Sequence, residues 1–104
     1  MSKPTITITY CPKCGWLLRA TYMAAELLST FVDELGGVML KPAGTAGEFR
    51  ISIDGEELID RKADGGFPEI TALKRLVRDR IAPQKPLGHV DRRHEVPGPK
   101  KKVK

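Results

Sequence analysis

The 104-residue sequence has few residues of the kinds that carry common chemistry: two cysteines, two histidines and one tryptophan. It also has no run of about 18 apolar residues, the length that spans a bilayer, so we expect no contact with a membrane. Polar and apolar side chains alternate within residues 1–9, whereas a signal peptide needs an unbroken apolar core. We therefore expect a cytoplasmic protein, in which a lone cysteine pair is more often catalytic or metal-binding than structural.

An excess of basic charge is missing from most of the chain, although the net charge of the whole is +5. Residues 1–82 contain eleven lysines and arginines and eleven aspartates and glutamates, which cancel. Residues 83–104 hold the entire excess, together with four prolines and few apolar side chains. We interpret residues 1–82 as one folded domain and residues 83–104 as a disordered tail that adds little stability. A domain without basic excess is not expected to bind nucleic acid.

Both cysteines lie in the stretch Tyr10-Cys11-Pro12-Lys13-Cys14, between a segment that alternates like a strand and a long segment of helix formers. We expect Cys11 at the start of that helix, where unpaired backbone N–H groups and the macrodipole favour a thiolate. Cys14 would follow one turn later on the same face, close enough to form a disulfide. Cys11 is then predicted to be the exposed nucleophile of a redox pair, and Cys14 the resolving thiol.

Apolar periodicity predicts six elements in the order strand–helix–strand–strand–strand–helix. Their ranges are 5–10, 15–35, 38–40, 48–53, 56–61 and 68–82, with loops at 42–47 and 62–67. The dipeptide Asp54-Gly55 is typical of a tight hairpin between the last two strands. The apolar residues expected in the core from the first long helix are Trp16, Leu17, Ala20, Ala24, Leu27, Leu28, Phe31 and Leu35.

These elements predict an α/β fold with a four-stranded mixed sheet. The first helix is a crossover, which makes the first two strands parallel, whereas the hairpin makes the last two antiparallel. If the connection at residues 42–47 also reverses the chain, both loops lie at the carboxyl end of the first strand. They would then flank the cysteines, at the edge where α/β sheets usually place their sites.

Several motifs resemble those of the selenoprotein W-like (Rdx) family over roughly residues 4–82. They are Tyr10-Cys11-Pro12-Lys13-Cys14 with its helix, Ile53-Asp54-Gly55-Glu56, Asp60-Arg61-Lys62 and Asp64-Gly65-Gly66-Phe67-Pro68-Glu69. The resemblance implies a thioredoxin-like fold and thiol–disulfide chemistry without a cofactor. It implies glutathione or a thioredoxin-type protein as reductant, and protein disulfides or glutathionylated proteins as substrates. Many animal members carry selenocysteine at the second redox position, which Cys14 occupies here.

Four residues near the pair are candidates for substrate contact. Tyr10 and Trp16 border the cysteines and could shield the disulfide, although aromatic residues beside a site are usually packing. Gly66 and Phe67 could form a lip that a partner touches. The alternative is that Phe67 is a hydrophobic staple at the entrance of the last helix, and the sequence leaves both interpretations open.

The cysteine pair could also be inert or form half of a zinc site, because Cys-Pro-x-Cys-Gly occurs in zinc knuckles. A structural zinc site needs four ligands, and His89 and His94 in the tail are the only other candidates. We therefore expect no bound metal. The competing class of function is a non-enzymatic binding module, in which the cysteines hold a metal or are incidental. In that case the basic run Lys100–Lys104 would contact nucleic acid, whereas a solvated charge run is the simpler interpretation.

Overall fold

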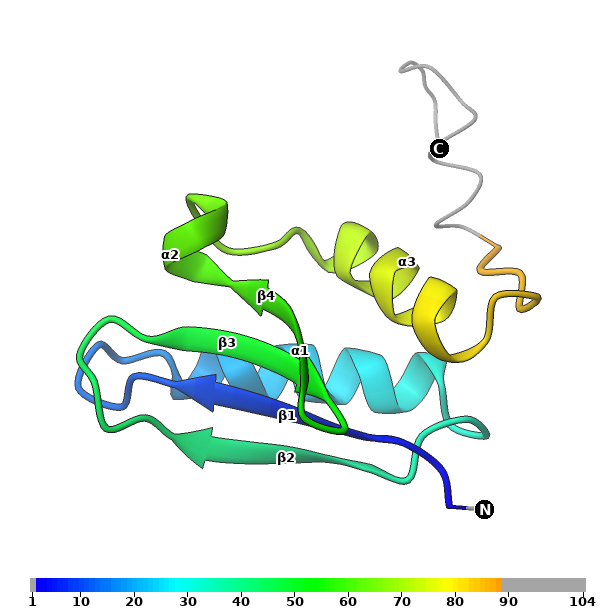
Figure 1. The fold of residues 1–104 in the computed structure, drawn as a ribbon, viewed down its shortest axis with the longest axis horizontal. Coiled ribbons are helices and arrows are strands. Elements are labelled where there is room, and N and C mark those ends of the chain that lie inside the picture. Colours follow the sequence, from blue (N-terminus) through cyan, green and yellow to red (C-terminus); the bar gives the residue numbers. More distant parts are fainter. Residues whose placement is uncertain (1, 89–104) are drawn as a thin grey trace.

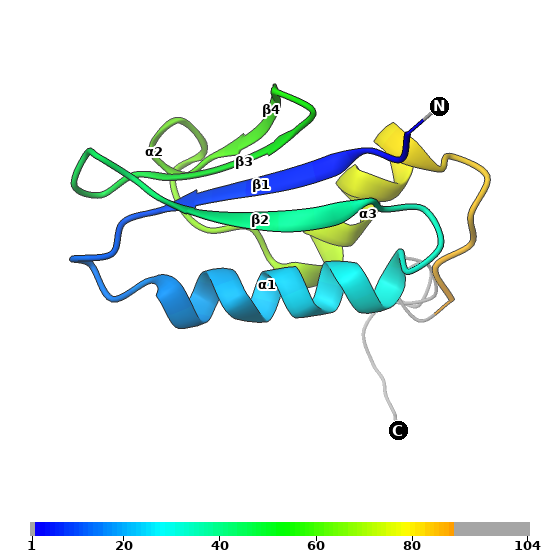
Figure 2. The same ribbon diagram turned by 90° about the horizontal axis from the view of Figure 1, so that it is seen from below.

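The computed structural model describes residues 2–88, which form a four-stranded sheet with two long helices on one of its faces (Figures 1 and 2). The elements are β1 (Thr5–Tyr10), α1 (Leu17–Thr30), β2 (Gly37–Pro42), β3 (Phe49–Ile53), β4 (Glu56–Asp60), α2 (Arg61–Asp64) and α3 (Ile70–Ile81). The predicted order is confirmed, with the short helix α2 as an addition. None of the helices within residues 2–88 has the length and apolar character needed to cross a membrane.

The strands are ordered β2-β1-β3-β4, so β1 is paired on both sides. It runs parallel to β2 and antiparallel to β3, and β3 runs antiparallel to β4. Tyr10, the last residue of β1, pairs with Pro42 on one side and Phe49 on the other. The predicted mixed sheet is therefore confirmed, and the connections after β2 and after β4 both lie at the carboxyl end of β1 (Figure 1).

One face of the sheet forms the core and the other is left open. Alternate residues of β1 (Ile6, Ile8 and Tyr10) are buried toward the helices, whereas the intervening threonines lie on the opposite face. Helices α1 and α3 both pack on the buried face (Figure 2). The residues that they contribute to this core include Ala20, Met23, Ala24, Leu27, Leu73 and Val77. The fold is thus a two-layer α/β arrangement.

Helix α1 is shorter than the predicted range 15–35. Gly15 has φ +76°, in the left-handed region, so the chain cannot enter a right-handed helix until after this residue. The expected core positions Leu17 and Leu28 are exposed, because the helix turns its Ala20–Leu27 side to the sheet. Trp16, also expected in the core, is half-buried and packs against it.

A half-buried charge pair joins the two long helices. Lys74 of α3 is only 5% exposed, and its Nζ atom lies 2.7 Å from Oε1 of Glu26 on α1. Removing Glu26 would leave the buried Lys74 charge without its counterpart, which is costly. The two residues are 48 positions apart in the sequence, so this contact became visible only in the tertiary structure.

Residues 83–88 stay on the folded domain, although we expected residues 83–104 to contribute little. Leu87 is 6% exposed and belongs to the core. The Nη1 atom of Arg78 donates to the Lys85 carbonyl oxygen at 3.0 Å, and Lys85 Nζ lies 3.2 Å from Oε2 of Glu34. The sequence did not reveal this anchor because a single leucine between Pro86 and Gly88 has no periodicity. Residues 89–104, with both histidines and the lysine run, lie outside the described residues.

We predict that Leu87→Ala lowers the free energy of unfolding by about 2–3 kcal/mol, because it removes a buried side chain and leaves a cavity. The matched control is Leu76→Ala, which truncates a leucine that is 42% exposed and should cost less than about 1 kcal/mol. Urea unfolding of the full chain measures both values. Equal losses for the two variants would contradict the anchoring role of Leu87.

Candidate redox site

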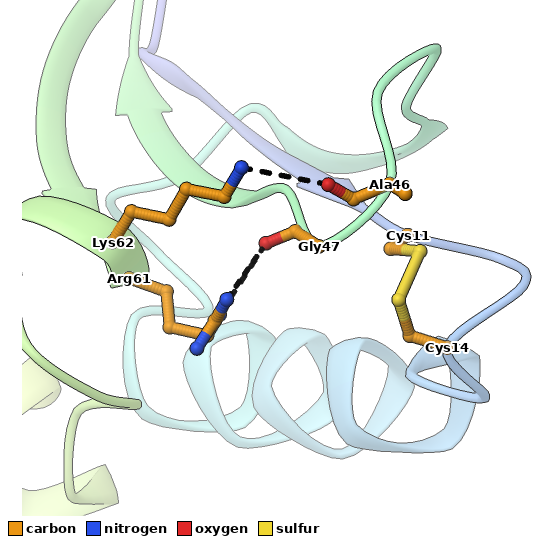
Figure 3. Close-up of a disulfide and its surroundings, with 6 residues drawn as sticks. All are labelled: Cys11, Cys14, Ala46, Gly47, Arg61 and Lys62. Carbon is orange, nitrogen blue, oxygen red and sulfur yellow. Dashed lines mark hydrogen bonds between the residues drawn. A yellow bond between two sulfur atoms is a disulfide. The ribbon is translucent and has the colours of Figure 1, made fainter.

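The two cysteines form a disulfide at the end of the central strand (Figure 3). Cys11 follows β1 directly, and Cys14 belongs to the turn that leads to α1. Their Cα atoms are 5.3 Å apart, and the Gly15 N–H donates to the Pro12 carbonyl oxygen at 3.2 Å within the same turn. The predicted proximity of the two thiols is therefore confirmed, and the disulfide lies in the middle of one sheet edge.

The two cysteines differ in exposure, and the difference is opposite to our expectation. Cys11 is 1% exposed, whereas Cys14 is exposed. The prediction that Cys11 begins the helix and is the more accessible thiol was wrong. Because the left-handed Gly15 delays the start of α1 to Leu17, Cys14 is the cysteine nearer to the helix start.

A hollow of about 220 Å³ lies beside the disulfide, between the cysteine turn and the β2–β3 connection. Its lining residues are Cys11, Pro12, Lys13, Ala43, Gly44, Thr45 and Ala46. The connection is held to β1 by the Ala43 N–H, which donates to the Tyr10 carbonyl oxygen at 2.8 Å. The hollow therefore offers a partner segment a place beside the cysteine turn.

Arg61 and Lys62 of α2 brace this connection from the side away from the disulfide (Figure 3). The Nη2 and Nε atoms of Arg61 donate to the Gly47 carbonyl oxygen at 3.1 and 3.4 Å. Lys62 Nζ lies 3.5 Å from the Ala46 carbonyl oxygen. The Arg61 guanidinium is also 4.9 Å from the Trp16 ring centroid, which is a cation–π distance. Arg61 therefore links α2, the β2–β3 connection and the residues after Cys14.

The position of Arg61 depends on α2, where the sequence predicted a loop over residues 62–67. Oδ1 of Asp60 accepts from the Lys62 N–H at 3.1 Å, and Oδ2 of Asp64 accepts from the Asp60 N–H at 3.0 Å. This reciprocal capping satisfies backbone donors at the start of the turn. An aspartate at each end of the segment, followed by Gly65, was the available sign of a short helix that periodicity could not detect.

The structure brings together Trp16, Phe49 and Phe67, as the predicted topology requires. Phe67 lies 4.9 Å from Trp16 and 5.1 Å from Phe49 between ring centroids, and both pairs are edge-to-face. The Arg19 guanidinium lies 3.9 Å from the Phe67 ring centroid. Phe67 and Gly66 are each partly exposed, so a substrate can reach them. Their contact with a substrate stays a prediction.

Tyr10 differs from the other three candidates for substrate contact. It is 9% exposed and belongs to the hydrophobic core, so a protein-sized substrate does not reach its ring. Trp16 is half-buried next to the cysteine turn, and its predicted shielding of the disulfide stays a prediction. As for metals, residues 2–88 contain no group of three or more His, Cys, Asp and Glu side chains that could hold an ion.

We predict that Arg61→Met loosens the β2–β3 connection, because the variant keeps the apolar stem but loses both hydrogen bonds to Gly47. Hydrogen bonds of this kind contribute about 1 kcal/mol each, so amide exchange in residues 43–48 should become about fivefold faster or more. Lys62→Met is the matched control and should leave the exchange nearly unchanged, since its Nζ contact is long and exposed. Hydrogen–deuterium exchange with mass spectrometry measures both. Unchanged exchange in Arg61→Met would show that the brace is unimportant.

Two mammalian relatives share part of this chain. Migration and invasion enhancer 1 of mouse is 34% identical over 74 residues, which is 70% of this chain and 61% of the mouse protein. The bovine protein of the same name is 34% identical over 64 residues, which is 61% of this chain and 52% of the bovine protein. The chain thus matches less than two thirds of the length of either relative.

Two solved bacterial structures match most of the chain. A protein from Bordetella parapertussis is 56% identical with a TM-score of 0.74, and the match covers 77% of this chain and 100% of that protein. A selenoprotein W-related protein from Vibrio cholerae is 44% identical with a TM-score of 0.72, covering 76% and 98%. The predicted thioredoxin-like fold is therefore confirmed. Residues 5–79 also match the model of the Rdx family. The chain belongs to the Rdx family.

Proposed function

We propose that this protein performs thiol–disulfide exchange through Cys11 and Cys14. The observation that carries the proposal is a disulfide at the open edge of the sheet, with one cysteine exposed and the other buried. Membership of the Rdx family and the Cys-x-x-Cys pair are consistent with a redox role. One accessible and one protected sulfur is the arrangement that a two-step exchange needs.

In this proposal Cys14 is the attacking thiol and Cys11 the resolving thiol, which reverses the roles expected from the sequence. A protein-sized substrate can approach Cys14, whereas Cys11 at 1% exposure is protected. The resemblance supports the reversal, because many animal members carry selenocysteine at the position of Cys14. Selenium is the more reactive element and would be expected at the sulfur position that meets the substrate.

The reducing direction proceeds in two steps. The Cys14 thiolate attacks one sulfur of a substrate disulfide, a mixed disulfide forms, and the other substrate sulfur leaves as a thiolate that takes up a proton. The Cys11 thiolate then attacks the Cys14 sulfur, so that the Cys11–Cys14 disulfide forms and the second substrate thiolate leaves. Two electrons pass from the protein dithiol to the substrate disulfide, and the reverse sequence oxidises a substrate dithiol.

A complete cycle needs a reductant for the Cys11–Cys14 disulfide. We propose glutathione or a thioredoxin-type protein in this role, and protein disulfides or glutathionylated proteins as substrates. The cytoplasm is the proposed location, because its thiol pools supply such reductants. The support for these partners is the family resemblance and the exposed position of Cys14.

Replacing each cysteine in turn tests the function and the roles together. Cys14→Ser should abolish exchange with a glutathionylated peptide, because the attacking sulfur is gone. Cys11→Ser should still attack but should accumulate a stable mixed disulfide at Cys14, since the resolving thiol is missing. Intact-protein mass spectrometry and peptide mapping identify the adduct. An adduct only on Cys11 would reverse the roles, and unchanged exchange in both variants would remove the redox function.

Limited alkylation of the reduced protein tests accessibility without a substrate. We predict that substoichiometric iodoacetamide modifies Cys14 at least about fivefold faster than Cys11, because thiolate reactivity requires access to the sulfur. Peptide mass analysis gives the two rates. Repeating the reaction in concentrated urea is the control, in which the difference in exposure disappears. Faster labelling of Cys11 in the folded protein would contradict the assignment.

A further inference from the structure

Charged side chains are unevenly distributed between the two ends of the sheet. We call the end that carries the cysteines the site edge. It carries six cations and three carboxylates, an excess of three positive charges, in a domain whose residues 1–82 sum to zero. The cations are Lys13, Arg19, Lys41, Arg50, Arg61 and Lys62, and the carboxylates are Glu48, Asp60 and Asp64. The sum over the sequence therefore conceals a local positive field.

The three carboxylates of the site edge already have partners. Glu48 forms an ion pair with Arg50, and Asp60 and Asp64 accept hydrogen bonds from backbone N–H groups of α2 and its cap. Lys13 and Lys41, by contrast, are exposed and form no ion pair within residues 2–88. Their charges are therefore available to a binding partner.

The available cations lie on different sides of the hollow beside the disulfide. Lys13 stands between the two cysteines and lines the hollow. Lys41, on the edge strand β2, pairs in register with Thr9, and its side chain lies on the open face of the sheet with Thr7, Thr9 and Arg50. Lys62 reaches the β2–β3 connection from α2, on the side away from the disulfide (Figure 3). A ligand at the disulfide would therefore meet positive charge on more than one side.

The far end of the sheet has no such positive excess, because its carboxylates stand against the cations Lys3, Arg78, Arg80 and Lys85. Its carboxylates are Asp33, Glu34, Asp54 and Glu56, which lie in the α1–β2 connection and around the β3–β4 hairpin. Two of them are paired with cations, Glu34 with Lys85 and Glu56 with Arg80. A charge distribution of this kind orients an acidic partner so that it arrives at the site edge first.

We propose that the site edge selects protein segments whose cysteine is flanked by acidic side chains. This inference rests on the proposed thiol–disulfide exchange and narrows its substrate class. Carboxylates beside the partner's cysteine would lie against Lys13. The charges of Lys41 and Lys62 would attract the flanking carboxylates from farther away, while the partner's sulfur meets Cys14. Selection acts mainly on the association rate, so it weakens as salt screens the charges.

Three synthetic peptides test the proposal with the reduced, full-length protein. Each carries one cysteine as a 2-pyridyl disulfide, flanked on both sides by aspartates, by serines or by lysines. Attack by Cys14 transfers the peptide sulfur to the protein and releases 2-thiopyridone, whose absorbance gives the rate. Cys11 then closes the disulfide and releases the peptide thiol. Dividing by the rate with dithiothreitol, an uncharged dithiol, removes differences in the peptides' own reactivity.

We expect the aspartate peptide to react about tenfold faster than the lysine peptide at low salt, and the ratio to approach one at about 0.5 M salt. Lys41→Glu should reduce the ratio of the aspartate-peptide rate to the lysine-peptide rate about threefold, while the rate of the serine peptide stays unchanged. Lys3→Glu, the matched control at the far end, should leave the ratio unchanged. The tail is identical in the parent protein and in both variants, so its charge cancels when their ratios are compared.

Two results would overturn the proposal. Equal normalised rates for the three peptides, or an unchanged ratio in Lys41→Glu, would remove the charge selection but leave the exchange function intact. Failure of even the serine peptide to react with the reduced protein would instead remove the exchange function, and the selection with it. The two failures are therefore distinguishable in one set of measurements.

Discussion

The pairing of β1 on both sides is the constraint on which the rest of the structure depends. The parallel register with β2 and the antiparallel register with β3 place Pro42 and Phe49 on either side of Tyr10. The β2–β3 connection must therefore cross the sheet edge next to Cys11. Gly36 belongs to this constraint, because a Cβ atom there would lie 2.9 Å from the Lys3 carbonyl oxygen and push β2 away from β1.

The disulfide lies at the rim of the domain, where its redox state can change without unfolding the core. It joins residues only three apart in the sequence, so it constrains the unfolded chain much less than a long-range disulfide would. The stability of the fold comes instead from the hydrophobic core between the helices and the sheet. The proposed exchange between dithiol and disulfide would depend on this separation of chemistry from stability.

The surroundings of the disulfide are ordered by contacts between segments that are far apart in the sequence. Arg61 reaches Gly47 and Trp16, and Phe67 packs against Trp16 and Phe49. These contacts hold the wall of the hollow and the start of α1 in one arrangement. The same elements bring the cations of the site edge together, so the positioning of the loop and the local charge have a common structural origin.

The sequence by itself determined the element order, the mixed sheet and the position of the cysteine pair at the edge. These follow from local rules: alternation in residues 5–10, the Asp54-Gly55 turn, and the crossover between the first two strands. Only the tertiary structure decided which cysteine is exposed, because that depends on the left-handed Gly15 and on packing against the β2–β3 loop. It also decided that Leu87 belongs to the core and that a domain with balanced charge has a positive site edge. Periodicity describes neighbours along the chain, whereas exposure and electrostatic field depend on neighbours in space.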